Sequence, residues 1–146
     1  MTDRGPYFLD TNIVMYAVGK DHSYKLPCRT ILERVERDEI DVVSSAEVLQ
    51  EILHRYFSLN RSDLAEIAYR ALEKACEQIF SVTKVDLDRA FDLLKAHPGI
   101  RSRDAVHAAV MLNNGLTQIL STDDHFDRIA GITRVDPTKN QLSSPV

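Results

Sequence analysis

Short hydrophobic runs alternate with longer segments of helical periodicity along most of the chain. The runs predict buried strands at residues 6–9, 40–45, 79–84, 117–122 and 132–135. Apolar residues recur three or four positions apart between the runs, which predicts helices over residues 24–37, 46–57, 60–78, 87–96 and 102–115. Strands that alternate with helices are typical of a parallel sheet covered by helices. The sequence therefore predicts a three-layer α/β/α domain with a central, mostly parallel sheet.

Polar residues just before the helical segments predict where those helices begin. Ser44 or Ser45 is placed to cap the helix over 46–57, and Glu47 is placed to help close a capping box there. Asp86 and Ser102 are the expected caps of the last two helices.

The length and composition of the chain predict one globular domain. At 146 residues and 44% hydrophobic content, residues 1–146 are sufficient for a single core, with a loose polar tail from about residue 137. No window approaches the roughly 18 apolar residues of a membrane span, and the first residues lack the pattern of a signal peptide. We expect a cytoplasmic protein that does not contact a membrane.

The two cysteines predict neither a disulfide nor a zinc site. Cys28 and Cys76 are far apart and fall on apolar helical positions, as buried core thiols do.

The formal charge of −4 argues against a protein that holds nucleic acid by bulk positive charge. It does not exclude a nuclease, because an acidic site neutralised by metal ions could account for the whole imbalance. The chain has 22 acidic and 18 basic residues. If four acidic residues belong to the metal site, the remaining 18 equal the number of basic residues.

Two acidic residues follow predicted strands that carry no charge of their own. Asp10 comes after the run "YFL", and Asp123 comes after "ILST". Ligands of parallel sheets bind beyond the carboxyl ends of the strands, so these two side chains are candidates for one site. Asp104, in the first turn of the helix over 102–115, leads toward the same edge. Each of the three also has a simpler interpretation as a turn, a cap or a partner of the helix dipole.

Glu51 is ambiguous from its spacing. The apolar residues of its helix form one face, and Glu51 lies nearly opposite the centre of that face, as a solvated glutamate does. It would join the other acids only if the polar side of this helix lined a cleft.

Clustered carboxylates would constrain the chemistry of such a site. They repel one another unless protons or cations neutralise them, and oxygen ligands suit Mg²⁺ or Mn²⁺ better than zinc. Divalent ions held there could bridge a phosphodiester, activate a water and stabilise the departing oxygen. The predicted reaction is phosphodiester hydrolysis.

Other kinds of site have less support. The sequence contains no Walker loop, GxGxxG, GxSxG or HExxH motif. Three arginines flank the acids and are equally well explained as phosphate contacts or as solvated surface residues. These are Arg101, Arg103 and Arg128.

Four motifs together resemble the PIN-domain ribonucleases, and among them the small VapC-like toxins of toxin–antitoxin pairs. The motifs are "YFLDTNIVMYA", "SSAEVLQEIL", "RSRDAVHAAVMLNNG" and "ILSTDDHFDRI". The resemblance implies that the conserved acids of the family correspond to Asp10, Glu51, Asp104 and Asp123, with Glu51 as a metal ligand or as the residue that orients a water. It also implies supporting roles for Asn12 and Thr122. The roles of four nearby residues stay open, namely Asp124, Asp127, His107 and His125.

The same resemblance implies a metal-dependent endoribonuclease that uses one or two Mg²⁺ or Mn²⁺ ions. Its substrate would be structured RNA such as tRNA, its inhibitor a small antitoxin protein, and its assembly a homodimer. The alternatives are a housekeeping PIN nuclease and a catalytically silent PIN-domain RNA-binding protein. A haloacid-dehalogenase-like phosphatase is disfavoured because Asn12 stands where that family needs an acid. A response-regulator receiver is disfavoured because Asp10 has no adjacent acid.

Overall fold

A computed structural model describes residues 4–139, and within this range five strands form one parallel sheet. The strands lie in the order β3-β2-β1-β4-β5, so the first strand is the central one. Their bounds are β1 Tyr7–Leu9, β2 Val42–Ser45, β3 Cys76–Phe80, β4 Gln118–Leu120 and β5 Thr133–Val135. The predicted α/β class and the central position of "YFL" are confirmed.

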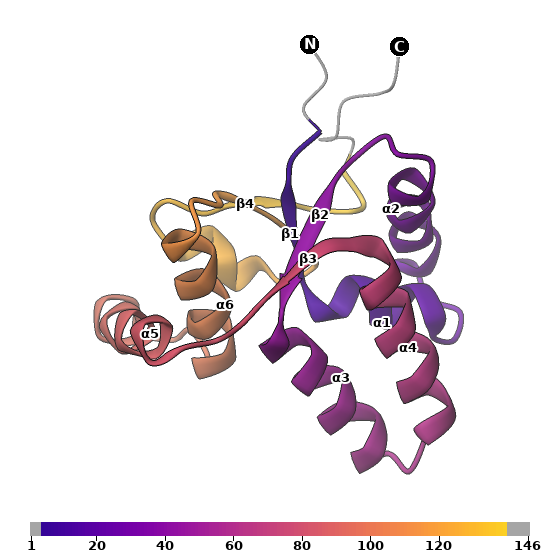
Figure 1. Ribbon diagram of the computed structural model, residues 1–146, viewed down its shortest axis with the longest axis horizontal. Helices are drawn as coiled ribbons and strands as arrows, with labels where there is room; N and C mark the ends of the chain where they lie inside the picture. The colour runs from indigo at the N-terminus through magenta and orange to yellow at the C-terminus, as the bar shows by residue number, and fades with distance from the viewer. Residues whose placement is uncertain (1–3, 140–146) are drawn as a thin grey trace.

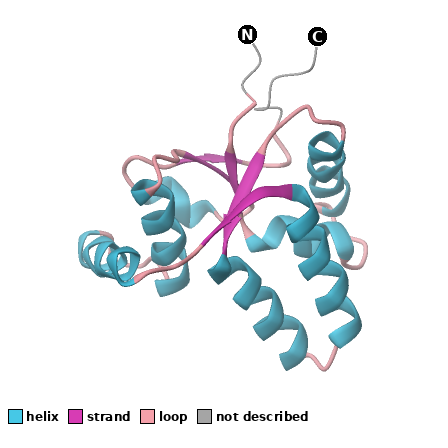
Figure 2. Ribbon diagram, in the orientation of Figure 1, coloured by secondary structure: helices cyan, strands magenta, loops and turns pink. Residues whose placement is uncertain are grey.

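The helices lie in two groups on the two sides of the sheet (Figures 1 and 2). On the right of Figure 1, α1 to α4 pack against one another, and on the left α5 packs on α6. The helix bounds are α1 Thr11–Val18, α2 Lys25–Glu36, α3 Ala46–Ser58, α4 Ser62–Ala75, α5 Lys84–Ala96 and α6 Ser102–Asn113, and a 3₁₀ turn, η1, spans Asp124–Arg128.

The strand order reverses next to β1, and this reversal creates a crevice. Successive strands are added on one side as far as β3, and the chain then returns to place β4 on the other side of β1. Loops leaving β1 and β4 therefore diverge at the carboxyl edge of the sheet. Such a switch point is where open parallel sheets bind their ligands.

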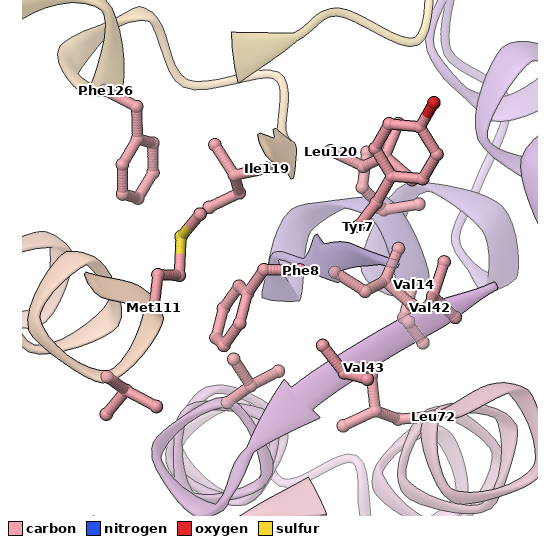
Figure 3. Close-up of a cluster of buried hydrophobic side chains, with 14 of the residues drawn as sticks. Tyr7, Phe8, Val14, Val42, Val43, Leu72, Met111, Ile119, Leu120 and Phe126 are labelled. Atoms are coloured by element: carbon pink, nitrogen blue, oxygen red, sulfur yellow. The ribbon is translucent and has the colours of Figure 1, made fainter. Parts of the chain in front are cut away.

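The core of the domain is built around β1, whose three residues are all buried. Figure 3 shows Phe8 directed toward α6, near Met111, whereas Val42 and Leu72 lie on the side of the other helices. Hydrophobic side chains on both faces of a strand are expected when helices cover both faces of a parallel sheet.

Helix α6 is buried along most of its length because it lies between the sheet and α5. Its sequence "DAVHAAVM" supplies small alanines, which allow the helices to approach closely. Asp104, His107 and Met111 share one face at helical spacing. This face brings His107 against Phe8, with ring centroids 5.7 Å apart.

The structure corrects the predicted boundary between the helix of residues 60–78 and the strand of residues 79–84. Helix α4 ends at Ala75, and β3 begins at once with Cys76 and ends at Phe80. β3 is an edge strand with no fully buried residue, so backbone pairing with β2 defines it rather than a hydrophobic run. The sequence interpretation also missed α1, a helix of only eight residues whose Ile13 and Val14 favour strands.

The structure also corrects three predicted caps. Ser45 precedes α3 but its side chain makes no cap hydrogen bond, so the capping box with Glu47 is not formed. α6 begins at Ser102 rather than after it. Asp86 is the third residue of α5, and the box there is formed with Thr83, whose backbone N–H donates to Asp86 at 2.9 Å.

The expectation for the cysteines holds for Cys28, which is buried in α2, but Cys76 begins β3 instead of lying on a helix and is half-buried. Both are free thiols. Burial raises the pKa of each to about 12, which keeps them protonated and unreactive. None of the helices in the described range is long and apolar enough to cross a membrane. Most of the predicted loose tail, residues 140–146, lies outside the described residues.

Candidate active site

Ten residues line a cleft at the switch point between β1 and β4. They include all four predicted acids and come from the ends of β1 and β4 and from α1, α3 and α6. The lining residues are Asp10, Thr11, Asn12, Met15, Glu51, Arg55, Arg101, Arg103, Asp104 and Asp123. The structure thus brings together side chains that are more than a hundred positions apart in the sequence.

Asp10 is buried and is held by several hydrogen bonds. It caps α1, because its Oδ1 accepts from the backbone N–H of Thr11 at 2.8 Å. Its Oδ2 accepts from Ser121 Oγ at 2.6 Å and from the amide of Asn12 at 3.0 Å. Burial raises the pKa of Asp10, and the opposing influence of His107 and Ser121 only partly offsets that rise.

Ser121 connects the two loops that form the cleft. Its hydroxyl donates to Asp10 and accepts from the backbone N–H of Asp123 at 3.0 Å. Asn12 makes a second link, since its Oδ1 accepts from the backbone N–H of Thr122 at 3.2 Å. Asn12 therefore lies next to Asp10 as predicted, whereas Thr122 contributes a backbone N–H. The hydroxyl that contacts Asp10 belongs to Ser121.

Glu51 is half-buried because the polar side of α3 lines the cleft. Its Oε1 lies 2.5 Å from Nε2 of His107, and its Oε2 accepts from Thr11 Oγ1 at 3.1 Å. Burial alone would raise the pKa of Glu51, but the hydrogen bond and the charge of His107 outweigh burial and lower it. The surface interpretation of Glu51 from its helical spacing is therefore wrong.

His107 is buried on α6 and faces two carboxylates. Besides Glu51, Oδ1 of Asp10 lies 3.8 Å from its Nε2. Burial lowers the pKa of His107, but the Glu51 hydrogen bond and the nearby negative charges outweigh burial, and the net shift is upward. The imidazolium form is favoured, and its charge offsets part of the acidic cluster.

Asp104 is a buried carboxylate whose Oδ2 has no hydrogen-bond partner among the described residues. Burial, followed by the charges of Asp123 and Asp10, raises its pKa to about 6. An unpaired buried carboxylate costs stability unless a proton or a cation neutralises it. Asp104 therefore fits a divalent cation that would lie among the acids.

Asp123 caps η1 and lies beside His125. Its Oδ1 accepts from the backbone N–H of His125 at 3.0 Å, and the ring Nδ1 of His125 is 2.7 Å from the same oxygen. This Nδ1 is buried and is not aligned for a hydrogen bond. One donor atom each from Asp104, Asp123 and His125 lie within 4.8 Å of one another.

Positive side chains line the entrance of the cleft. Arg101 and Arg103 precede or begin α6 and line the cleft as predicted, and Arg55 of α3 joins them, while Arg128 does not line it. The charge of Arg103 contributes to lowering the pKa of Glu51. An anionic polymer would meet these arginines before it reached the acids.

The sequence interpretation missed Thr11 and Ser121, and it left His107 and His125 open. A signal for His107 was present, because it is three positions after Asp104 and shares its helix face. Ser121 lies one position beyond β4, two residues before Asp123, but its partner Asp10 is 111 positions away. Nothing local in the sequence predicts that hydrogen bond.

The profile of the PIN domain family matches residues 7–132. Ribonuclease VapC13 of Mycobacterium tuberculosis is 35% identical over 127 residues, which cover 87% of this chain and 97% of that protein. Ribonuclease VapC23 of the same species is 38% identical over 118 residues, covering 81% of this chain and 92% of that protein.

Two solved structures share the fold. VapBC2 from Rickettsia felis, bound to a DNA fragment from its promoter, aligns with a TM-score of 0.66 at 18% identity and covers 89% of this chain and 97% of that chain. A toxin–antitoxin complex from Klebsiella pneumoniae aligns with a TM-score of 0.62 at 17% identity and covers 91% and 98% of the two chains.

Proposed function

This chain belongs to the PIN domain family, and we propose that it is a metal-dependent endoribonuclease that acts as the toxin of a toxin–antitoxin pair. The observation that carries the proposal is the convergence of Asp10, Glu51, Asp104 and Asp123 in one cleft of a chain whose relatives are named ribonucleases. The relatives are matched over nearly their whole length, so the proposal concerns the entire domain.

We assign the metal ligands to Asp10, Asp104 and Asp123, which would hold one or two Mg²⁺ or Mn²⁺ ions. Glu51 acts as a further ligand or orients a water. When bound, a divalent ion supplies positive charge at the scissile phosphate and lowers the pKa of a nearby water. The buried, unpaired oxygen of Asp104 supports a cation at this place rather than a purely protein-based site.

The chain's own residues hold this arrangement rigid. Ser121 and Asn12 fix the orientation of the Asp10 carboxylate, and Thr11 and His107 fix that of Glu51. Supporting hydrogen bonds of this kind preserve the geometry of metal ligands. The preorganised cleft therefore needs little rearrangement when substrate arrives.

The reaction is hydrolysis of an RNA phosphodiester. Water attacks phosphorus in line, a new P–O bond forms, and the bond from phosphorus to the leaving ribose oxygen breaks. One proton of the water passes to solvent, and the leaving oxygen takes up a proton from solvent. The products are one RNA end with a phosphate monoester and one with a hydroxyl.

The assay for this function uses purified protein and a mixed RNA pool in Mn²⁺, Mg²⁺ or EDTA. We expect cleavage that requires a divalent metal and falls by at least about 100-fold in Asp10→Asn, because the amide keeps the shape but loses the charge. Asp92→Asn, on the exposed surface of α5, is the matched control and should cleave normally. Equal persistence of RNA with wild type and Asp10→Asn in every metal would refute the function.

The partner we propose is a small antitoxin protein that blocks the acidic cleft. The Klebsiella structure that shares this fold is itself a toxin–antitoxin complex. Expression of the chain alone should arrest growth, and Asp104→Asn or co-expression of the antitoxin should restore it. Harmless wild-type expression would instead indicate a housekeeping nuclease. Homodimerisation and tRNA as substrate are further parts of the proposal that come from the family resemblance. A cytoplasmic location is a part that comes from the sequence pattern.

A further inference from the structure

We propose that His125 is a nitrogen ligand of the catalytic metal ion, which it binds together with Asp104 and Asp123. The inference rests on the metal dependence proposed above, and it adds a donor beyond the four acidic residues. It also locates the ion at one end of the cleft.

The geometry of the three side chains fits a shared ion. One oxygen of Asp104, one of Asp123 and one ring nitrogen of His125 lie within 4.8 Å of one another. Donors around a single Mg²⁺ or Mn²⁺ ion lie roughly 3 to 4.5 Å apart, since each is about 2.0 to 2.2 Å from the ion. The spacing of the three donors is close to this range.

Two polar atoms of this group lack a hydrogen-bond partner among the described residues. Oδ2 of Asp104 is buried on a residue that is only 8% exposed, and Nδ1 of His125 is also shielded from solvent. The imidazole nitrogen lies 2.7 Å from Asp123 Oδ1 without the alignment of a hydrogen bond. Buried polar atoms are normally satisfied, and a cation shared by the three side chains would satisfy both.

The carboxylates at the other end of the cleft already have protein partners, and Nδ1 of His107 is the buried polar atom there that has none among the described residues. Both oxygens of Asp10 accept hydrogen bonds, and both oxygens of Glu51 contact Thr11 or His107. His107 would also bring positive charge to that end. A cation is therefore needed most at Asp104 and Asp123, and His125 lies beside Asp123 although it is not one of the ten lining residues.

A nitrogen ligand changes which ion the cleft prefers. Imidazole binds Mn²⁺ and the later transition metals well, whereas Mg²⁺ favours oxygen ligands throughout. The structure thus assigns His125 a role in metal selectivity, with Mn²⁺ preferred over Mg²⁺. Replacing His125 should weaken Mn²⁺ binding more than Mg²⁺ binding.

The direct test is electron spin-echo spectroscopy of Mn²⁺ bound to the purified protein. A coordinated imidazole nitrogen modulates the echo, and we expect this ¹⁴N modulation in wild type and in His54→Ala, which removes an exposed histidine of α3. It should disappear in His125→Ala. Modulation that survives in His125→Ala, or that is lost only in His107→Ala, would overturn the assignment.

Calorimetric titration with Mn²⁺ and with Mg²⁺ provides the second measurement. We expect His125→Ala and His125→Gln to weaken Mn²⁺ binding by about 10-fold or more and Mg²⁺ binding by less than about 3-fold. Equal effects on the two ions would contradict the proposal. If Mn²⁺ binds without ¹⁴N modulation, the role of His125 fails while the metal-dependent function stands. If no divalent ion binds wild type, both fail.

Discussion

The hydroxyl of Ser121 donates a 2.6 Å hydrogen bond to Oδ2 of Asp10, although the two residues are 111 positions apart in the sequence. The bond joins the loop after β4 to the end of β1 across the switch point of the sheet. Ser121 also accepts from the backbone N–H of Asp123. One buried hydroxyl thus positions two of the acids that we assign to the metal.

Replacing Ser121 by alanine should therefore reduce both activity and stability. We expect RNA cleavage to fall by about 10- to 100-fold and the free energy of unfolding by about 1 to 2 kcal/mol, because the buried Asp10 carboxylate loses a donor. Ser58→Ala, at the exposed end of α3, is the matched control. Cleavage kinetics measure the first effect and urea unfolding curves measure the second. A variant that cleaves at the wild-type rate would contradict this role.

His107 should couple the stability of the domain to pH. Its pKa is raised above the ordinary 6.5, so the stability that it contributes is complete below about pH 6.5 and is lost as pH rises through the raised pKa. His107→Gln keeps a donor for Glu51 but cannot titrate. Unfolding curves between pH 6 and 9 should show a decline in wild type that is absent in the variant, and parallel curves would exclude the coupling.

His107→Ala should be more damaging than His107→Gln. Alanine leaves Oε1 of Glu51 without its partner in a half-buried place, which costs about 1 to 3 kcal/mol of unfolding free energy. Glutamine should recover much of that loss. Equal stability of the two variants at pH 6 would show that packing of the ring, rather than the bond to Glu51, is what matters.

The ionised Asp104 side chain should lower the free energy of unfolding of the metal-free protein at neutral pH. Its pKa of about 6 lies above the ordinary 3.8, so stability falls as pH rises from about 4 through 6, where the folded state must release the proton. Asp104→Asn removes this burden and should raise stability without metal at pH 7.5 by on the order of 1 kcal/mol, after discounting for solvent screening.

The same protonation predicts the pH dependence of metal binding. Thermal shifts caused by Mn²⁺ should be larger at pH 7.5 than at pH 5, because protons compete for Asp104 at the lower pH. In Asp104→Asn the thermal shift caused by Mn²⁺ should be small at both pH values. An identical Mn²⁺ shift in wild type at the two pH values would place the ion away from Asp104.

Arg103 should contribute to RNA binding rather than to the chemical step. It lines the cleft from the first turn of α6 and offers charge to the phosphate backbone. We expect Arg103→Ala to raise KM by about 3- to 30-fold with a smaller change in kcat, and to weaken the dependence of KM on salt. Arg29→Ala, on the exposed side of α2, is the charge-matched control. A change confined to kcat would contradict this role.

Hydrophobic periodicity predicted the fold class, and their places at strand ends or in the first turn of a helix made three aspartates candidates for one site. Asp10 and Asp123 were accessible to that reasoning because a carboxylate that directly follows an uncharged buried strand is a local signal. Glu51 could not be predicted in this way, because the spacing of residues along α3 indicates only which face of the helix points away from the core. Whether that side faces solvent or a cleft depends on where α6 and α1 lie.

The remaining features depend on contacts between distant segments. Ser121 is one polar residue among several after β4, and only the pairing of β1 with β4 brings it to Asp10. The edge strand β3 has no hydrophobic pattern, and its backbone pairing with β2 defines it. Asp10 caps α1, so the same side chain stabilises the start of a helix and forms part of the cleft.

The central claim is that the protein cleaves RNA in the cell with the four acidic residues of the cleft. Mapping of RNA ends tests this claim most directly. Total RNA would be sequenced at nucleotide resolution shortly after expression of wild type or of Asp10→Asn is induced to equal levels. We predict new RNA ends at a small set of positions with wild type alone. The absence of new ends, or the same ends in both samples, would contradict the account.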